Sequence, residues 1–328
     1  MSQAKRALVT GAGGFIGSHL VEALVRDGQE VTALVHYNAM RDIGNLRHLP
    51  ADMLANVEVI FGDVTDGEFC REIVAGKDYV FHLAALIAIP YSYSAPRSYV
   101  RTNVEGTLNI LEACRRTGVE RILHTSTSEV YGSALYVPID EKHPLQGQSP
   151  YSASKIGADM MAQSYFRSFD TPVVTVRPFN TYGPRQSARA FIPTVIGQAR
   201  LGPTIMMGAT TPIRDLTFAT DTAQGFLAAA KTPGIDGETV NLGVGHGFTV
   251  AHVAETILEI MGVDGEIVLD PKRIRPEKSE VDRLISANAK FQALSGWSPK
   301  VELREGLQRT VEFFLQEDPA REARAYVV

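Results

Sequence analysis

The chain contains only two cysteines in 328 residues, which excludes the disulfide framework of a small secreted protein. Cys70 and Cys114 lie far apart in the sequence, and the histidines show no spacing typical of a zinc site. We therefore expect both thiols to be buried and reduced, no bound metal, and a cytoplasmic location.

Long apolar segments are also missing. No run of about 18 apolar residues could span a bilayer, and no charged and then apolar leader precedes a small-residue cleavage site. The formal net charge is −5 and the pI is about 5.9, so the chain as a whole does not attract polyanions. We expect no membrane and no nucleic acid among its partners, and an anionic ligand must be held by a local cluster of basic side chains.

Internal repeats and low-complexity tracts are absent as well, and the length allows two domains of ordinary size. Through the first half, short runs rich in β-branched residues alternate with longer helical stretches. This alternation predicts an α/β protein with a Rossmann-type doubly wound parallel sheet, covered by helices on both faces. The predicted strands are Ala7–Thr10, Val31–Val35, Val57–Phe61, Tyr79–Leu83, Arg121–Thr125 and Val173–Val176.

The second half is punctuated by proline and glycine and predicts a smaller C-terminal α/β domain that binds the substrate. We place the first domain at residues 1–177 and the second at residues 178–328, and we expect residues 215–245 to return to the first. Trp297 is expected to anchor the core of the second domain. Helices are predicted at Ile192–Leu201, Asp221–Ala230, Val250–Met261 and Leu303–Leu315, and a returning strand at Thr239–Leu242.

A glycine-rich turn lies between the first predicted strand and the first helix. Glycine there permits a tight turn and lets the backbone approach a pyrophosphate, whose charge the N–H groups and dipole of a helix N-terminus attract. This position indicates a dinucleotide cofactor bound at Gly11, Gly14, Phe15, Ile16 and Gly17.

The end of the second strand leaves the choice between NAD and NADP open. His36 and Asn38 follow this strand, without the acidic residue that would bind a ribose 2′-hydroxyl and repel a 2′-phosphate. His36 and Arg41 could accept such a phosphate, or they could be solvated loop residues.

Tyr151 and Lys155 form a candidate acid–base pair, because residues four apart lie on one face of a helix. A lysine ammonium near a phenol stabilises phenolate and lowers the pKa of the tyrosine. The phenol oxygen can then accept a hydroxyl proton as hydride leaves for nicotinamide. Thr127, just after the strand at 121–125, is the candidate hydroxyl group beside this pair.

The glycine spacing and the order Thr127, Tyr151, Lys155 resemble the extended branch of the short-chain dehydrogenase/reductase superfamily. The resemblance implies that Tyr151 and Lys155 also contact the cofactor. It further implies that Asp63 and Val64, at the end of the third strand, contact its adenine, and it slightly favours NAD.

Glu129 indicates which reaction of that superfamily the chain performs. Thr127, Ser128 and Glu129 resemble the Thr-Ser-Glu triplet of the GDP-mannose enzymes among the nucleotide-sugar 4,6-dehydratases. A C4 ketone makes the C5 proton of a sugar acidic. The resemblance implies that Glu129 removes this proton and donates one to the departing C6 hydroxyl.

Two longer stretches, residues 136–159 and 177–189, resemble the dehydratases of the legionaminic-acid and related amino-sugar pathways. Those enzymes act on UDP- or GDP-N-acetylglucosamine, and we expect UDP-N-acetylglucosamine as the substrate. Arginine forks bind phosphate oxygens at two points, so a diphosphate in an acidic protein needs such side chains. The implied substrate-binding residues are Asn180, Arg185, Arg189, Arg214 and Arg275.

The same motifs leave rival reactions open, because UDP-glucuronate decarboxylases share a very similar stretch around Glu129. A C4 epimerase, a 5,6-ene-forming dehydratase and a cofactor-sensing module without turnover are further alternatives. The carrier nucleotide, the exact sugar and the C5 stereochemistry of the product stay open. The superfamily resemblance also implies a homodimer with a four-helix interface formed by Ser98–Thr117 and Tyr151–Phe169.

Overall fold

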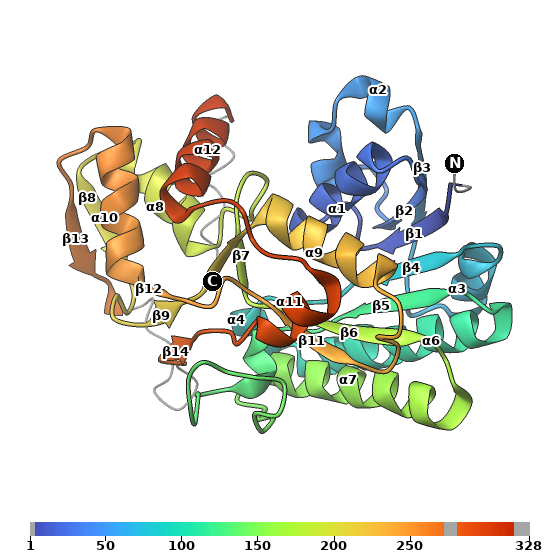
Figure 1. The fold of residues 1–328 in the computed structure, drawn as a ribbon. Helices are drawn as coiled ribbons and strands as arrows, with labels where there is room; N and C mark the ends of the chain where they lie inside the picture. Colours follow the sequence, from blue (N-terminus) through green and yellow to red (C-terminus); the bar gives the residue numbers. More distant parts are fainter. Residues whose placement is uncertain (1–3, 272–280, 318–328) are drawn as a thin grey trace.

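The computed structural model describes residues 4–271 and 281–317. Its centre is a seven-stranded sheet in the order β11-β6-β5-β4-β1-β2-β3, in which every neighbouring pair is parallel (Figure 1). The predicted Rossmann-type fold class is therefore confirmed. The strands are β1 (Arg6–Thr10), β2 (Glu30–His36), β3 (Val57–Gly62), β4 (Tyr79–His82), β5 (Arg121–Thr125), β6 (Val173–Pro178) and β11 (Thr239–Leu242).

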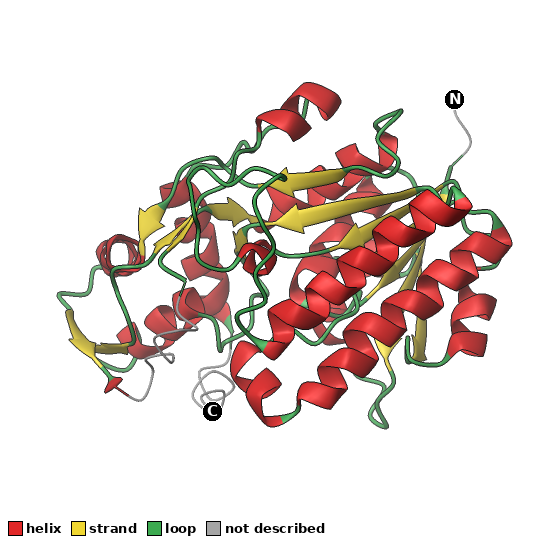
Figure 2. Cartoon of the chain, turned by 90° about the horizontal axis from the view of Figure 1, so that it is seen from below, coloured by secondary structure: helices red, strands yellow, loops and turns green. Residues whose placement is uncertain are grey.

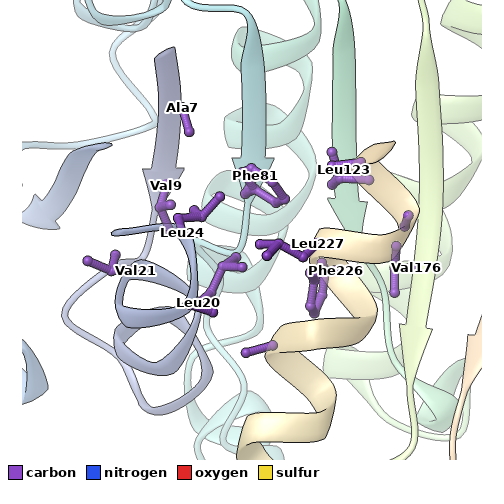
Figure 3. Close-up of a cluster of buried hydrophobic side chains, with 14 of the residues drawn as sticks. Ala7, Val9, Leu20, Val21, Leu24, Phe81, Leu123, Val176, Phe226 and Leu227 are labelled. Carbon is purple, nitrogen blue, oxygen red and sulfur yellow. The ribbon is translucent and has the colours of Figure 1, made fainter. Parts of the chain in front are cut away.

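One face of the sheet is covered by two helices, α1 (Phe15–Arg26) and α9 (Ala219–Lys231). Successive side chains on a strand point to opposite faces, so Val9 of β1 joins this layer while Leu8 faces away. Figure 3 shows Leu20 and Leu24 of α1 on one side of this cluster and Phe226 and Leu227 of α9 on the other. Burial of these side chains holds the two helices against the strands.

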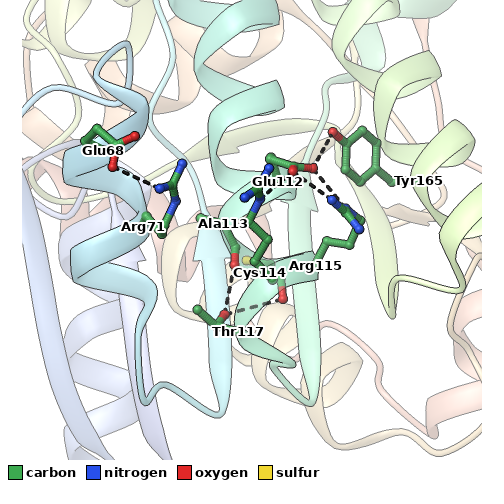
Figure 4. Close-up of polar contacts among 9 residues, drawn as sticks. Glu68, Arg71, Glu112, Ala113, Cys114, Arg115, Thr117 and Tyr165 are labelled. Atoms are coloured by element: carbon green, nitrogen blue, oxygen red, sulfur yellow. Dashed lines mark hydrogen bonds and ion pairs between the residues drawn. The ribbon is translucent and has the colours of Figure 1, made fainter.

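The opposite face is covered by α3 (Gly67–Val74), α6 (Gly106–Thr117) and α7 (Pro150–Phe169), a layer that Figure 2 shows from below. Both expected buried thiols lie here, and burial raises the pKa of Cys70 to about 12 and that of Cys114 further. Tyr165 of α7 donates a hydrogen bond of 3.1 Å to Glu112 of α6 (Figure 4). This contact fixes α6 beside α7.

The segment before α6 differs from the single amphipathic stretch expected at Ser98–Thr117. It consists of α4 (Ile89–Ser94), α5 (Pro96–Tyr99) and a π-helical turn at Val100–Glu105. Asn103 in this turn donates hydrogen bonds to the Leu86 carbonyl, at 3.0 Å, and to Ser154 Oγ, at 2.9 Å. The turn is thereby attached to α7. The remaining elements of the first half are η1 (Gly44–His48), α2 (Ala51–Leu54) and η3 (Ser128–Tyr131).

The chain returns to the large sheet through α9 and β11, and β11 pairs with β6. The expectation for Trp297 is wrong. Its indole lies in the same core as α1 and α9, packs on Phe291 and donates a hydrogen bond of 3.2 Å to the Asp221 carbonyl. The helix that carries Phe291, α11 (Ala289–Ser295), contacts β11, so the chain has already returned to the first core at this point.

The remaining elements form a smaller α/β region with its own apolar core, and the predicted helices are confirmed within a few residues. Its helices are α8 (Phe191–Ala199), α10 (Val250–Met261) and α12 (Leu303–Gln316). Its short strands form three small sheets. They are β7 (Asn180–Tyr182), β8 (Thr204–Met207), β9 (Ile213–Arg214), β10 (Leu216–Phe218), β12 (Phe248–Thr249), β13 (Glu266–Leu269) and β14 (Arg283–Leu284).

Within residues 4–271 and 281–317, no helix has both the length and the apolar character needed to span a bilayer.

The core between α1 and α9 makes a stability prediction. Phe226 is fully buried there, so Phe226→Ala should lower the free energy of unfolding by about 3–5 kcal/mol, measured by urea denaturation. Leu201→Ala is the matched control, because Leu201 is 75% exposed and its loss should change stability by less than about 0.5 kcal/mol. Equal effects of the two substitutions would contradict this account of the core.

Candidate active site

A cavity of about 900 Å³ lies at the carboxyl ends of the parallel strands, where ligands of open α/β sheets bind. It extends from the glycine-rich turn to Glu129 and Tyr151. A second cavity of about 360 Å³ continues from it into the smaller region. The two share five lining residues, Glu129, Asn180, Thr181, Gln186 and Ala190.

The glycine-rich turn packs too tightly for side chains. Gly11 has a φ of +71°, and a Cβ atom there would lie 2.8 Å from the Ala84 nitrogen. A Cβ at Gly17 would lie 2.2 Å from the Gly11 carbonyl oxygen. The first turn of α1 contains no acidic residue, and Gly14 precedes it without a side-chain cap. Its N–H groups therefore remain available to an anion, and Phe15 and Ile16 line the cavity beside them.

At the predicted adenine end of the site, His36 and Asp63 lie near each other. His36 lines the large cavity with a mostly exposed side chain, and its Nε2 lies 3.6 Å from Asp63 Oδ2. Burial opposes ionisation of Asp63, but hydrogen bonds from Thr65 and the nearby His36 lower its pKa overall. Val64 is buried under α6, and its carbonyl accepts a hydrogen bond from Asn109. The adenine contacts of Asp63 and Val64 stay predictions.

Tyr151, Lys155 and Thr127 meet in the large cavity. A helix begins at Pro150 because Ser149 forms a capping box with Ser152, and this start places Tyr151 in the first turn of α7. The Thr127 side chain lies close enough to the Tyr151 phenol to lower its pKa. Lys155 donates a hydrogen bond of 2.6 Å to the Thr125 carbonyl at the end of β5.

Burial is the largest influence on the pKa values of Tyr151 and Lys155. Burial lowers the pKa of Lys155 to about 8, although the charge of Asp159 raises it. The pKa of Tyr151 is raised by burial, and the charge of Glu129 also raises it, while the nearby Thr127 side chain opposes both. The tyrosine pKa is therefore raised and not lowered as expected from the sequence, because burial disfavours the phenolate and nearby carboxylates add to this effect.

Glu129 lies where the two cavities meet. It belongs to η3, whose first turn is capped by Thr127, since the Thr127 hydroxyl accepts a hydrogen bond of 3.2 Å from the Glu129 N–H. Ser128 also lines the large cavity. The Thr127, Ser128 and Glu129 motif therefore puts a hydroxyl group and a carboxylate at the same end of the cavity as Tyr151.

The predicted substrate-binding residues fall into two groups. Asn180 lines both cavities, and its Oδ1 is buried without a hydrogen-bond partner among the described residues. Arg189 and Arg214 line the smaller cavity, where Arg214 also donates to the Ile213 carbonyl. Arg185 instead forms an ion pair of 2.7 Å with Glu22 of α1.

Arg185 is therefore held between the two regions of the chain and lines neither cavity. Its Nη1 is buried without a partner among the described residues. Arg275 lies outside the described residues.

Two residues near the site are absent from the sequence-based set. Ser126 lines the large cavity, and Asp159 lies one turn beyond Lys155 on α7 and is fully buried. The spacing Tyr151, Lys155, Asp159, with four residues at each step, is the signal that could have identified Asp159.

In the described part of the chain, no group of three or more His, Cys, Asp or Glu side chains is arranged to hold a metal ion.

The chain is similar to nucleotide-sugar enzymes along most of its length. The family model of GDP-mannose 4,6 dehydratase matches residues 8–310. A dTDP-D-glucose 4,6-dehydratase of Mus musculus is 32% identical over 322 residues, which cover 95% of this chain and 89% of that protein. A UDP-glucose 4-epimerase of Mycolicibacterium smegmatis is 32% identical over 316 residues, with 94% and 98% covered.

Among solved structures, a dTDP-glucose 4,6-dehydratase from Streptomyces venezuelae with NAD bound has a TM-score of 0.84 and 30% identity. The match covers 95% of this chain and 97% of that one. Together with the Rossmann-type sheet and the grouping of Thr127, Glu129, Tyr151 and Lys155, these similarities identify the superfamily. The chain belongs to the GDP-mannose 4,6-dehydratase family, within the extended short-chain dehydrogenases/reductases that include nucleotide-sugar 4,6-dehydratases and epimerases.

Proposed function

We propose that the protein is an NAD(P)-dependent 4,6-dehydratase that converts UDP-N-acetylglucosamine to its 4-keto-6-deoxy sugar. The observation that carries this proposal is the position of Glu129, at the junction of the two cavities and close enough to Tyr151 for its charge to raise the tyrosine pKa. A carboxylate at this point supplies the base that elimination of water requires and C4 oxidation alone does not.

The glycine-rich turn and the first turn of α1 fit a dinucleotide pyrophosphate, because Gly11 and Gly17 leave no room for side chains and the helix N-terminus carries no acid. NAD is bound by the similar Streptomyces venezuelae enzyme. When bound, the cofactor would accept hydride from C4 and return it to C6, so that it ends the cycle as it began. Without an acidic residue at the end of β2, NADP is also a candidate for this chain.

Tyr151 takes the C4 hydroxyl proton in this scheme, with Thr127 orienting the same hydroxyl. A buried tyrosine with a raised pKa holds its proton, so its activation requires positive charge nearby. Lys155 is the one Lys or Arg side chain that lines the large cavity among residues 4–271 and 281–317. Glu129 then removes the C5 proton, and the same carboxylic acid protonates the departing C6 hydroxyl.

The diphosphate of the substrate would lie in the smaller cavity, held by Arg189 and Arg214. The buried Asn180 Oδ1 can accept a hydrogen bond from a sugar hydroxyl or amide at the junction. The choice of UDP and of N-acetylglucosamine rests on the resemblance of residues 136–159 and 177–189 to amino-sugar dehydratases.

The charges of the site also bear on the rival reactions. A glucuronate substrate would bring a C6 carboxylate toward Glu129. The Lys or Arg that lines the described large cavity is Lys155, which is needed beside Tyr151. The C6 carboxylate would therefore have no cation to pair with in that cavity. A C4 epimerase needs no carboxylate at position 129. Both observations favour dehydration.

We also propose a homodimer through α6 and α7. Leu108 of α6 and Met160 of α7 are partly exposed apolar side chains on these adjacent helices. Light scattering at micromolar concentration should give twice the 35.7 kDa chain mass, and Met160→Arg should shift it toward the monomer because a charge would be buried in the interface. A monomeric wild-type protein would rule out the dimer.

Tyr151→Phe should lower turnover by about 10²- to 10⁴-fold, because it removes the oxygen that accepts the C4 proton. Cofactor affinity, measured by fluorescence titration, should stay nearly unchanged because little binding surface is lost. Lys155→Met should weaken both. Wild-type turnover in Tyr151→Phe would show that another group is the base.

An experiment in D2O with UDP-N-acetylglucosamine and no reductant separates dehydration from the rival reactions. The product, analysed by mass spectrometry and NMR, should have lost water and gained one deuterium at C5, because the original C5 proton leaves with the C6 hydroxyl and C5 is reprotonated from solvent when hydride returns to C6. Glu129→Gln should keep slow C4 oxidation and lose elimination, since an amide cannot accept the C5 proton.

A product that retains its C6 hydroxyl would assign the protein to the epimerases. Turnover of dTDP-glucose but not of UDP-N-acetylglucosamine would leave the dehydratase assignment intact and correct the substrate.

A further inference from the structure

The helix that carries Tyr151 and Lys155 has a third polar residue on the same face. Asp159 follows Lys155 by four residues, as Lys155 follows Tyr151, and its side chain is completely buried. Burial of a carboxylate costs free energy unless the group is paired and hydrogen-bonded, so the partners of Asp159 indicate its role in the structure.

Asp159 is hydrogen-bonded from two neighbouring strands. Its Oδ1 lies 2.9 Å from His124 Nε2 on β5, and its Oδ2 accepts a hydrogen bond of 2.7 Å from Ser126 Oγ. The guanidinium of Arg177 on β6 donates to the same Oδ2 at 2.9 Å and 3.2 Å. All of these side chains are buried, and Arg177 also donates to Tyr131 at 3.0 Å.

Lys155 and Asp159 form hydrogen bonds with consecutive residues at and just after the end of β5. The Thr125 carbonyl accepts a hydrogen bond from Lys155, and the Ser126 hydroxyl donates one to Asp159. The Thr127 side chain lies beside Tyr151 and lowers its pKa, so three consecutive residues face three successive turns of α7. The Ser126 N–H, which donates to the Val176 carbonyl at 2.7 Å, attaches the same segment to β6.

We propose that Asp159 is a positioning residue for the acid–base pair: its buried carboxylate keeps Lys155 protonated and holds Ser126, so that Thr127 and Glu129 stay beside Tyr151. This inference rests on the proposed role of Tyr151 and Lys155. It adds a residue that contacts neither substrate nor cofactor.

Charges around Lys155 support this role. Burial alone favours neutral Lys155 and lowers its pKa. The negative charge of Asp159 opposes this effect and raises the pKa. Burial also opposes ionisation of Asp159, but the His124 hydrogen bond and the charge of Arg177 lower its pKa. The other titratable groups that face this centre among the described residues are His82 of β4 and His124 of β5, whose pKa values burial lowers, together with Tyr99, Tyr131, Tyr151, Arg177 and Glu129.

The test is the titration of Lys155 in D159N, which removes the charge and keeps the shape. NMR of the full-length protein labelled at the lysine ε-carbon would follow it, with the Lys155 signal identified by its loss in Lys155→Met. We expect the midpoint of Lys155, about 8 in the wild type, to move down by about one pH unit. This readout needs no substrate, so it is independent of whether the protein is a dehydratase.

Turnover should follow the same titration. Lys155 must be protonated to stabilise the phenolate, so activity is lost as pH rises through the lysine pKa, and in D159N this alkaline limb should move to lower pH. Above the new midpoint, turnover should fall about tenfold for each pH unit. Substrate KM should change little, because Asp159 does not line either cavity.

Two variants separate this role from a contribution to folding. D159N leaves Arg177 buried without its carboxylate, so D159N/R177M should recover much of the lost stability while Lys155 still titrates below its wild-type midpoint. D236N is the matched control. Asp236 pairs at 2.7 Å with Arg121 at the opposite end of β5, so its loss should lower the melting temperature and leave Lys155 unchanged.

An unchanged Lys155 midpoint in both D159N and the double variant would overturn the proposal. So would activity that tracked melting temperature across all three variants. A shifted midpoint in a protein that forms no 4-keto-6-deoxy sugar would uphold the role of Asp159 and refute the proposed reaction.

Discussion

The arrangement of the site depends on the attachment of α7 to the end of β5. Lys155 donates to the Thr125 carbonyl at the point where the strand would otherwise leave an unpaired acceptor. This contact fixes the axial position of α7 against the sheet, and Tyr151, one turn earlier, is thereby brought to Thr127. The position of Glu129 is fixed in turn, because η3 begins at the residue after Thr127. One lysine therefore sets the geometry of a hydroxyl and a carboxylate at the start of η3 and of a phenol on α7.

Desolvation and charge oppose each other throughout this region. Burial favours neutral Lys155 and neutral Tyr151, whereas general acid–base chemistry needs an ammonium beside a phenol that can ionise. The protein reduces this conflict with a second buried charge, Asp159, whose own cost is lowered by Arg177 and by a hydrogen bond from His124. This network has little tolerance for substitution, because Asp159 is hydrogen-bonded to His124, Ser126 and Arg177 at once.

Much of the fold and the reactive group could be predicted because the relevant signals are local. Strands buried on both faces appear as short β-branched runs, and a glycine turn and a four-residue helical spacing each act within one turn of chain. The π-helical turn at Val100–Glu105, the position of Trp297 and the ion pair of Arg185 with Glu22 depend instead on contacts between distant segments. An arginine motif cannot indicate whether its guanidinium faces a ligand or a neighbouring helix.

The return of the chain through α9 and β11 has a consequence for biosynthesis. Once residues 1–178 have emerged from the ribosome, six of the seven strands are available, but α1 still lacks Phe226 and Leu227 on its apolar side, and β6 has an open edge. That nascent chain exposes an unpaired strand and an apolar surface until about residue 242 emerges. The two regions therefore cannot fold strictly in order of synthesis, and the long sequence separation of their contacts makes completion of the sheet a late and slow event.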